Sequence, residues 1–222
     1  MSKEVFVALI DSGCNFETYE KIAIHIENNR IKIKNQNNIN FEHGNVIGNI
    51  IKDENINIYD IQVFNENLST TPHHIFGALN YLKDKKVDVI SMSLGLKTNY
   101  KEIEELCREF IKKGVVIISS YPKSGQEFVY PASYENVIKV TSEGKCMDDK
   151  VVVLDKDKLF FGANPFSTVK NVAGSSVAVA KFTKEFCSYI KKGFSKIEII
   201  EEFSKRIDRK STRLNSSHSR AS

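Results

Sequence analysis

The sequence predicts an α/β fold in which a mostly parallel central sheet is flanked by helices. Short apolar runs bounded by turn residues alternate with segments of helical period along the chain. This order is typical of a parallel sheet that is covered on both faces. The chain has 222 residues, of which 41% are hydrophobic and 27% are charged. This length allows one buried core and is too short for two ordinary domains, so we expect a single globular domain.

In the first half of the chain, the predicted strands are short apolar or β-branched runs. Strands are predicted at residues 5–10, in two stretches of 21–34 and at 56–64, and helices at 43–52 and 72–83. Asn28 and Asn29 separate the two short stretches, and the Asn-rich segment 35–40 is expected to be a loop. Thr71 followed by Pro72 is typical of a helix cap with proline at the first helical position, and predicts where the second helix begins.

The second half repeats the order strand, helix, strand. Strands are predicted at residues 87–92, 115–120, 137–141, 151–154 and 159–161, and helices at 100–113, 175–191 and 195–206. Ile103, Leu106 and Phe110 form one apolar stripe on the first of these helices, and Gly114 ends it. The two shortest strands are close enough in sequence to form a hairpin. Gly193 separates the last two helices.

The positive charge of the chain lies mainly at its C-terminus. The formal net charge is +4, from 32 Lys and Arg against 28 Asp and Glu, and residues 208–222 contribute +3 of it. No basic stripe with interleaved aromatic residues remains, which argues against nucleic-acid binding. The tail from Asp208 resembles the translation of a sequencing-library adapter. We therefore expect a folded domain at 1–207 that lacks its natural C-terminus, and a disordered adapter scar at 208–222.

The N-terminus and the cysteines indicate a cytoplasmic protein. No apolar run reaches the roughly 20 residues that a membrane-spanning helix needs. The apolar run at 5–10 is too short for a secretory signal and is followed by no small-residue cleavage site. The four cysteines are widely spaced with no CxxC pair, which favours reduced thiols over a disulfide framework or a zinc site. We expect no membrane partner and no metal.

Three polar residues occupy positions that often carry chemistry. Asp11 follows the strand at 5–10, and sites form at the carboxyl ends of strands in α/β sheets, although an Asp-Ser-Gly segment is more often only a turn. His43 begins a helix, where a surface histidine without a role is the ordinary alternative. Ser176 begins another helix, whose free N–H groups suit a nucleophile that must support an oxyanion. The alternative is a helix cap by Ser175 or Ser176.

Taken together, the three residues occur in an informative order. The His follows the Asp by 32 residues, and the Ser follows the His by 133 residues. The segments VALIDSG, EHGNVIG and GSSVAVA resemble the Asp, His and Ser motifs of the subtilisin-like serine proteases, also called subtilases or peptidase family S8. Between them, VDVISMSLG, GVVIISSYPKSG and VYPASYENVIKVTS follow in the order of that family. The resemblance covers about residues 5–192 and implies a subtilisin-like three-layer fold.

The resemblance also implies an activity and the residues that carry it. The chain is expected to be a serine endopeptidase that hydrolyses peptide bonds through an acyl-enzyme. Ser176 is then the nucleophile, His43 is the general base, and Asp11 orients and supports the imidazolium. This chemistry needs neither a cofactor nor a metal. The expected partner is a peptide or protein substrate.

Two more segments of the resemblance bear on the substrate. The substrate is expected to lie extended against the strand edge at Ser93, Leu94 and Gly95 and to pair as an added β-strand, the alternative being a plain turn at a strand end. An ungapped match puts Lys123 where the family has an Asn that donates to the oxyanion. Losing that donor typically costs about 100- to 1000-fold in turnover. Lys123 could act there itself, Ser124 could substitute, activity could be low, or Lys123 could have no role.

The sequence leaves more than one function open. The first hypothesis is a cytoplasmic serine endopeptidase that acts on a limited set of peptides, such as the leader of a precursor. The second is a catalytically impaired subtilisin-like fold that acts as a peptide-binding module, with Lys123 marking the loss. A flavodoxin-like binding domain is less favoured because neither GxGxxG nor GxxxxGK[ST] occurs. The sequence indicates neither the natural substrate nor the oligomeric state.

Overall fold

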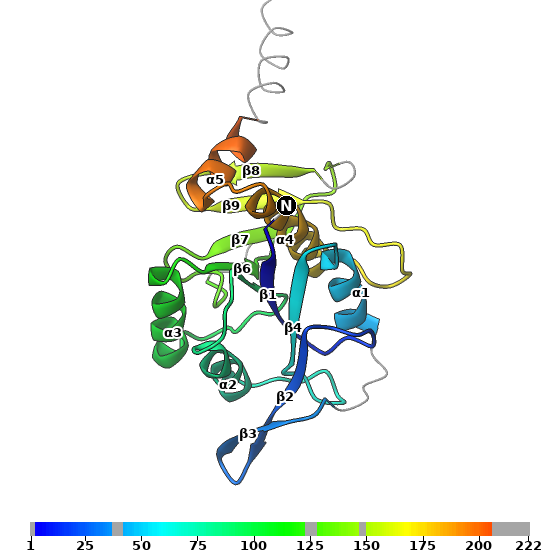
Figure 1. Cartoon of the computed structure of the whole chain (residues 1–222), viewed down its shortest axis with the longest axis vertical. Coiled ribbons are helices and arrows are strands. Elements are labelled where there is room, and N and C mark those ends of the chain that lie inside the picture. The colour runs from blue at the N-terminus through cyan, green and yellow to red at the C-terminus, as the bar shows by residue number, and fades with distance from the viewer. Residues whose placement is uncertain (1–2, 37–41, 123–127, 147–149, 206–222) are drawn as a thin grey trace, which may run out of the picture.

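Helices cover both faces of a central sheet in the computed structural model of the chain (Figure 1), which describes residues 3–36, 42–122, 128–146 and 150–205. Within these residues, nine strands form one sheet in the order β3-β2-β4-β1-β5-β6-β7-β9-β8. The strands are β1 (Val5–Asp11), β2 (Glu20–Glu27), β3 (Arg30–Lys34), β4 (Ile56–Gln62), β5 (Val89–Met92), β6 (Val116–Ser120), β7 (Ile138–Ser142), β8 (Val151–Asp155) and β9 (Phe160–Ala163).

The helices form two layers around this sheet. They are α1 (Glu42–Ile51), α2 (Pro72–Leu82), α3 (Lys101–Lys112), α4 (Ser175–Lys191) and α5 (Lys196–Ser204). Apolar side chains of α1, α4 and α5 share one buried cluster with one face of the sheet. Side chains of α2 and α3 share a second cluster with the other face. The predicted three-layer α/β class is therefore confirmed. No helix of the described ranges is long and apolar enough to cross a membrane.

The sheet is parallel except at its two edges, where a hairpin adds the outermost strand. β2 and β3 pair antiparallel, and so do β8 and β9. Asn28 and Asn29, between β2 and β3, have φ angles of 50° and 57°. A two-residue turn with both φ angles positive matches the twist of a hairpin, and Asn tolerates this conformation better than most residues. The pair of Asn residues therefore explains where the chain reverses.

Two helix starts differ in detail from the predicted capping. α2 begins at Pro72 as expected, but the Thr71 hydroxyl contacts His74 Nδ1 at 2.8 Å and makes no capping bond to a backbone N–H. α4 has Gly174 at its N-cap with φ of 104°, and no side chain caps it. Capping by Ser175 or Ser176 is therefore wrong. A glycine suits this position because its backbone conformation is strained for other residues.

β1 is an interior strand of the sheet, and its end carries the candidate site. It lies between β4 and β5, and all of its residues are buried. The chain leaves β1 through Ser12 and Gly13, and α1 approaches this turn closely. A Cβ atom at Gly44 would lie 2.5 Å from the carbonyl oxygen of Gly13 and 2.8 Å from Ser12 Oγ. Only glycine at position 44 allows this approach without a shift of backbone.

Replacing Gly44 by alanine is expected to lower the free energy of unfolding by about 1–3 kcal/mol, because the added methyl group meets backbone atoms that cannot rotate away. Urea denaturation measures the change. Gly144→Ala is the matched control, since a Cβ there meets no atom within 4 Å and φ is not positive. The control should stay within about 0.5 kcal/mol of the wild type. Equal effects of the two substitutions would contradict the close approach of α1.

Candidate active site

The carboxylate of Asp11 and the imidazole of His43 are in direct contact. Asp11 ends β1 and is fully buried, whereas the side chain of His43, near the start of α1, is 33% exposed. Asp11 Oδ1 lies 2.8 Å from His43 Nδ1 and also accepts the N–H of Ser12 at 2.7 Å. The predicted turn role of Asp11 and its contact with His43 therefore coexist. The alternative of a surface histidine without a partner does not fit this geometry.

The contact with Asp11 determines which nitrogen of the neutral His43 ring carries the proton, and it also affects the pKa of the ring. An ionised carboxylate can only accept hydrogen bonds, so Nδ1 carries the proton, and in the neutral ring Nε2 is the acceptor. Burial lowers the pKa of His43, but the hydrogen bond to Asp11 and the negative charge of Asp11 raise it, and the net result is a pKa above the ordinary 6.5. The pair therefore stabilises the imidazolium form of His43.

The turn that follows β1 also holds the first turn of α1. Ser12 Oγ accepts the N–H of Gly44 at 3.0 Å, and Cys14 Sγ donates to the carbonyl oxygen of Gly44 at 3.4 Å. Both backbone groups of the residue after His43 are thus bonded to the segment that carries Asp11. The same turn sets the positions of the carboxylate and of the imidazole.

Polar residues of the neighbouring strands hold this turn in place. Asp60 Oδ2 accepts the N–H of Cys14 at 2.8 Å, and Gln62 Nε2 donates to the carbonyl oxygen of Ser12 at 2.8 Å. Lys21 Nζ donates to the carbonyl oxygen of Cys14 at 2.7 Å. These supporting residues were not predicted from the sequence. The available signal was the pair Asp60 and Gln62, two polar residues at a spacing of two near the end of a predicted strand.

The thiol of Cys14 is a poor candidate nucleophile despite its proximity to Asp11. Burial raises the pKa of Cys14, and the negative charges of Asp60 and Asp11 raise it further. Only a thiolate is strongly nucleophilic, and this thiol stays protonated. Its role in the structure is that of a hydrogen-bond donor to Gly44.

Ser176 is the second residue of α4, the helix that packs against α1 (Figure 1). The neighbouring Ser175 donates its hydroxyl to the carbonyl oxygen of Tyr121 at 3.4 Å, which ties the start of α4 to the end of β6. Within the described residues no hydrogen bond joins Ser176 to His43. The structure therefore brings Asp11 and His43 into contact, and it brings Ser176 onto a helix adjacent to that of His43.

The proposed substrate segment lies at the same end of the sheet. Ser93, Leu94 and Gly95 follow the last residue of β5 and are not part of a strand. Ser120 Oγ, at the end of β6, donates to the carbonyl oxygen of Leu94 at 3.2 Å. Gly95 is exposed, and a Cβ there would lie 2.5 Å from Val129 Cγ1. The predicted site residue Lys123 and its neighbour Ser124 lie outside the described residues.

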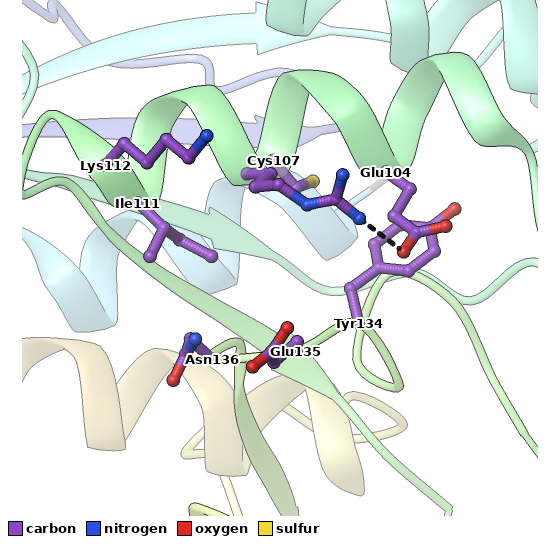
Figure 2. Close-up of a pocket in the computed structure, with 8 residues that line it drawn as sticks. Glu104, Cys107, Ile111, Lys112, Tyr134, Glu135 and Asn136 are labelled. Carbon is purple, nitrogen blue, oxygen red and sulfur yellow. Dashed lines mark hydrogen bonds and ion pairs between the residues drawn. The ribbon is translucent and has the colours of Figure 1, made fainter.

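A pocket of about 200 Å³ lies elsewhere, between α3 and the segment 134–136 (Figure 2). It is lined by Glu104, Cys107, Arg108, Ile111, Lys112, Tyr134, Glu135 and Asn136. Arg108 is bonded to Glu104 at 3.1 Å, and burial raises the pKa of Cys107 to about 12. This pocket therefore offers no activated nucleophile, and none of the sequence-predicted site residues lines it. No three His, Cys, Asp or Glu side chains of the described chain could hold a metal ion together.

Curated relatives are proteases of Bacillus species. The chain is 36% identical over 83 residues to the "Major intracellular serine protease" of Bacillus subtilis (strain 168), which is 35% of this chain and 26% of that protein. It is 29% identical over 91 residues to "Subtilisin DY" of Bacillus licheniformis, which is 39% of this chain and 33% of that protein. The matches thus span only about a quarter to a third of the length of these relatives.

Comparison of structures and of family profiles extends over most of the chain. The solved structure of "Sphericase" matches with a TM-score of 0.69 at 16% identity, covering 92% of this chain and 83% of that one. At this identity the likeness shows the fold, which is subtilisin-like. The profile of the family described as "Subtilase family" matches residues 2–185. Since this match covers most of the 222 residues, the chain belongs to the subtilase family.

Proposed function

We propose that this subtilase-family chain is a serine endopeptidase that hydrolyses peptide bonds through an acyl-enzyme. The observation that carries the proposal is the hydrogen bond of 2.8 Å between Asp11 Oδ1 and His43 Nδ1. It leaves Nε2 of His43 as a base on the helix that packs against α4, and Ser176 is the second residue of α4. Family membership and the relatives named as serine proteases support the same class of reaction.

In the first step Ser176 Oγ attacks the carbonyl carbon of the scissile peptide bond, and His43 Nε2 takes the hydroxyl proton. The carbonyl oxygen becomes an oxyanion, and the charge of Asp11 stabilises the imidazolium. The carbon–nitrogen bond then breaks as His43 gives its proton to the leaving amine. The absence of a bond between Ser176 and His43 in the free protein is compatible with this step, because catalytic hydrogen bonds are often longer without substrate.

In the second step a water molecule attacks the acyl-enzyme. His43 Nε2 takes a proton from the water, whose oxygen bonds to the acyl carbon. The ester bond to Ser176 then breaks, and His43 returns the proton to Ser176 Oγ. The peptide acid leaves, and both side chains regain their starting states.

The start of α4 supplies a donor for the oxyanion. Ala178 N–H bonds to the carbonyl oxygen of Gly174, so the N–H of Ser176 precedes the first intrahelical bond and has no acceptor within the helix. The positive end of the helix favours negative charge there. Lys123 is proposed as the second group near the oxyanion, in place of the Asn that the family usually has.

The proposed substrate is a peptide or protein that lies extended along Ser93, Leu94 and Gly95. The link from Ser120 to Leu94 and the link from Ser175 to Tyr121 support this, because they join the segment to the start of α4. We further propose a cytoplasmic enzyme that processes a limited set of peptides, which the likeness to a protein named an intracellular serine protease supports. Profiling against a peptide library tests this, and broad cleavage without site preference would count against it.

Ser176→Ala is expected to abolish labelling by a fluorophosphonate probe, which forms a covalent bond only with an activated serine. Folding should be nearly unchanged, because no side chain caps α4 and only one hydroxyl is lost. Gel fluorescence measures labelling, and circular dichroism checks the fold. Ser175→Ala, one residue earlier on the same helix, is the matched control and should retain labelling.

Two outcomes would contradict the assignment of Ser176. Labelling that persists in Ser176→Ala would identify another nucleophile. A wild-type protein that is folded, binds peptides and is never labelled would favour the peptide-binding alternative.

The acid limb of the pH profile of kcat/KM is expected to lie above pH 6.5, because the base must be neutral and Asp11 raises the pKa of His43. Activity should therefore fall as the pH falls through this raised pKa. Asp11→Asn removes the negative charge that supports the imidazolium and leaves the opposing effect of burial on the pKa of His43, so the limb should move to lower pH. The same substitution should lower kcat by about 10⁴-fold, since it favours the wrong tautomer. An unchanged limb in Asp11→Asn would show that Asp11 does not set the pKa of His43.

Lys123→Asn is expected to raise kcat, because a neutral amide donates to an oxyanion without the hydration that an ammonium group keeps. The gain is bounded by the roughly 100- to 1000-fold that one such donor contributes. Steady-state kinetics with a peptide substrate measures it. A lower kcat at unchanged KM would instead assign the transition-state contact to the lysine itself. No change in either constant would remove Lys123 from the site.

A further inference from the structure

Asp60 is a fully buried carboxylate on the face of the sheet that α1 and α4 cover. It lies on β4 opposite Leu9 of β1 and Lys21 of β2. Side chains alternate along a strand, so Asp60 shares its face with Ile58, which belongs to the cluster under α1 and α4. Its Oδ2 atom accepts the N–H of Cys14, whereas Oδ1 is buried without a hydrogen-bond partner among the residues that the structure describes.

A carboxylate in this position is costly. Burial raises the pKa of Asp60 to about 6, although the Cys14 N–H, Gln36 and Lys21 act against burial, and the charge of Asp11 adds to the rise. An apolar residue would fit the neighbouring side chains without this desolvation cost. Stability alone therefore does not account for the carboxylate. We look for its role in the hydrogen bond that it accepts from the Cys14 N–H.

That group belongs to the turn that carries the candidate active site. Asp60 holds the amide of Cys14, and the thiol of Cys14 donates to the carbonyl oxygen of Gly44. Gly44 directly follows His43, and its N–H is bonded to Ser12 Oγ. A path of hydrogen bonds thus runs from Asp60 through Cys14 to Gly44 and Ser12. These two residues directly follow His43 and Asp11.

We infer that Asp60 is a positioning residue for the Asp11–His43 pair, because its carboxylate holds the amide of Cys14 and thereby the turn between them. This inference rests on the proposed function, in which the pair activates Ser176. Asp60 touches neither the ring of His43 nor the substrate in this scheme. It acts through the turn alone.

The test compares two changes at position 60. Asp60→Ala removes the acceptor of the Cys14 N–H and frees the turn, so the contact between Asp11 and His43 should loosen. We expect kcat to fall at least about tenfold with little change in KM, since misplacement of catalytic groups by an ångström can cost about 100-fold. The pKa of His43 should fall as well, because the bond to Asp11 is what opposes burial. Asp60→Asn keeps an oxygen acceptor at this position and should restore most of kcat.

Asp88 provides a matched control at the other end of β1. Asp88 Oδ2 accepts the backbone N–H of Phe6 at 2.8 Å, a bond of the same type and length as that of Asp60 to Cys14. Asp88→Ala removes this bond from the start of β1 and should leave kcat and the pKa of His43 unchanged. If Asp60→Ala does not fold, Asp60→Val makes the same comparison, because it offers no acceptor and suits a buried strand.

Two readouts separate this inference from the proposed function. The pKa of His43 is measured by NMR titration of its ring protons, which requires no activity, with His43→Gln to assign the signal. If the wild type neither hydrolyses peptides nor reacts with a fluorophosphonate, the proposed function fails, and a lower pKa of His43 in Asp60→Ala still supports positioning. If the wild type is active and both kcat and the pKa of His43 are unchanged in Asp60→Ala, the positioning role is overturned. It is also overturned if Asp88→Ala reproduces the effects of Asp60→Ala.

Discussion

Asp11 is a carboxylate at the end of β1, an interior strand, and the cost of burying it organises this end of the molecule. A buried charge without a partner costs several kcal/mol, so the fold must bring a donor to Asp11. The donors are the N–H of Ser12 and the ring of His43, and the second requires the first turn of α1 to lie directly against the end of β1. Gly44 makes this approach possible because a side chain there would overlap the backbone of Gly13. The pairing of one carboxylate with one imidazole thus determines where a helix sits.

The same end of the sheet contains more buried polarity than a core normally does. Asp60, Gln62 and Ser12 are all buried, and each is bonded to the turn after β1 or belongs to it. Apolar residues dominate the remainder of this face, where Val5, Val7 and Leu9 of β1 pack under α1 and α4. The two ends of β1 therefore contribute in different ways. Its first residues contribute apolar packing, whereas its last residue and the following turn form hydrogen bonds of fixed geometry. Hydrogen bonds at buried polar groups fix the geometry of the Asp11–His43 contact, which apolar packing alone cannot do.

The carboxyl ends of β1, β5 and β6 lie at the same end of the sheet as the N-termini of α1 and α4. Parallel strands joined through helices produce this arrangement, because each crossover returns the chain in the same direction. Ser175 joins α4 to the residue after β6, and Ser120 joins β6 to the segment after β5. Residues that are far apart in sequence are thereby placed at one end of the parallel strands.

The sequence by itself determined the elements and the class of fold, because the period of apolar residues, the Asn28–Asn29 turn and the start of α2 at Pro72 depend on local chemistry. It also indicated Asp11, His43 and Ser176 through motifs that resemble a family. Only the tertiary structure decided which groups support them. Asp60 meets Cys14 across 46 positions of sequence and Gln62 meets Ser12 across 50, and both contacts depend on β4 pairing with β1 rather than with another strand. Local periodicity carries no information about strand order, so the supporting hydrogen bonds and the uncapped start of α4 could be known only from the folded chain.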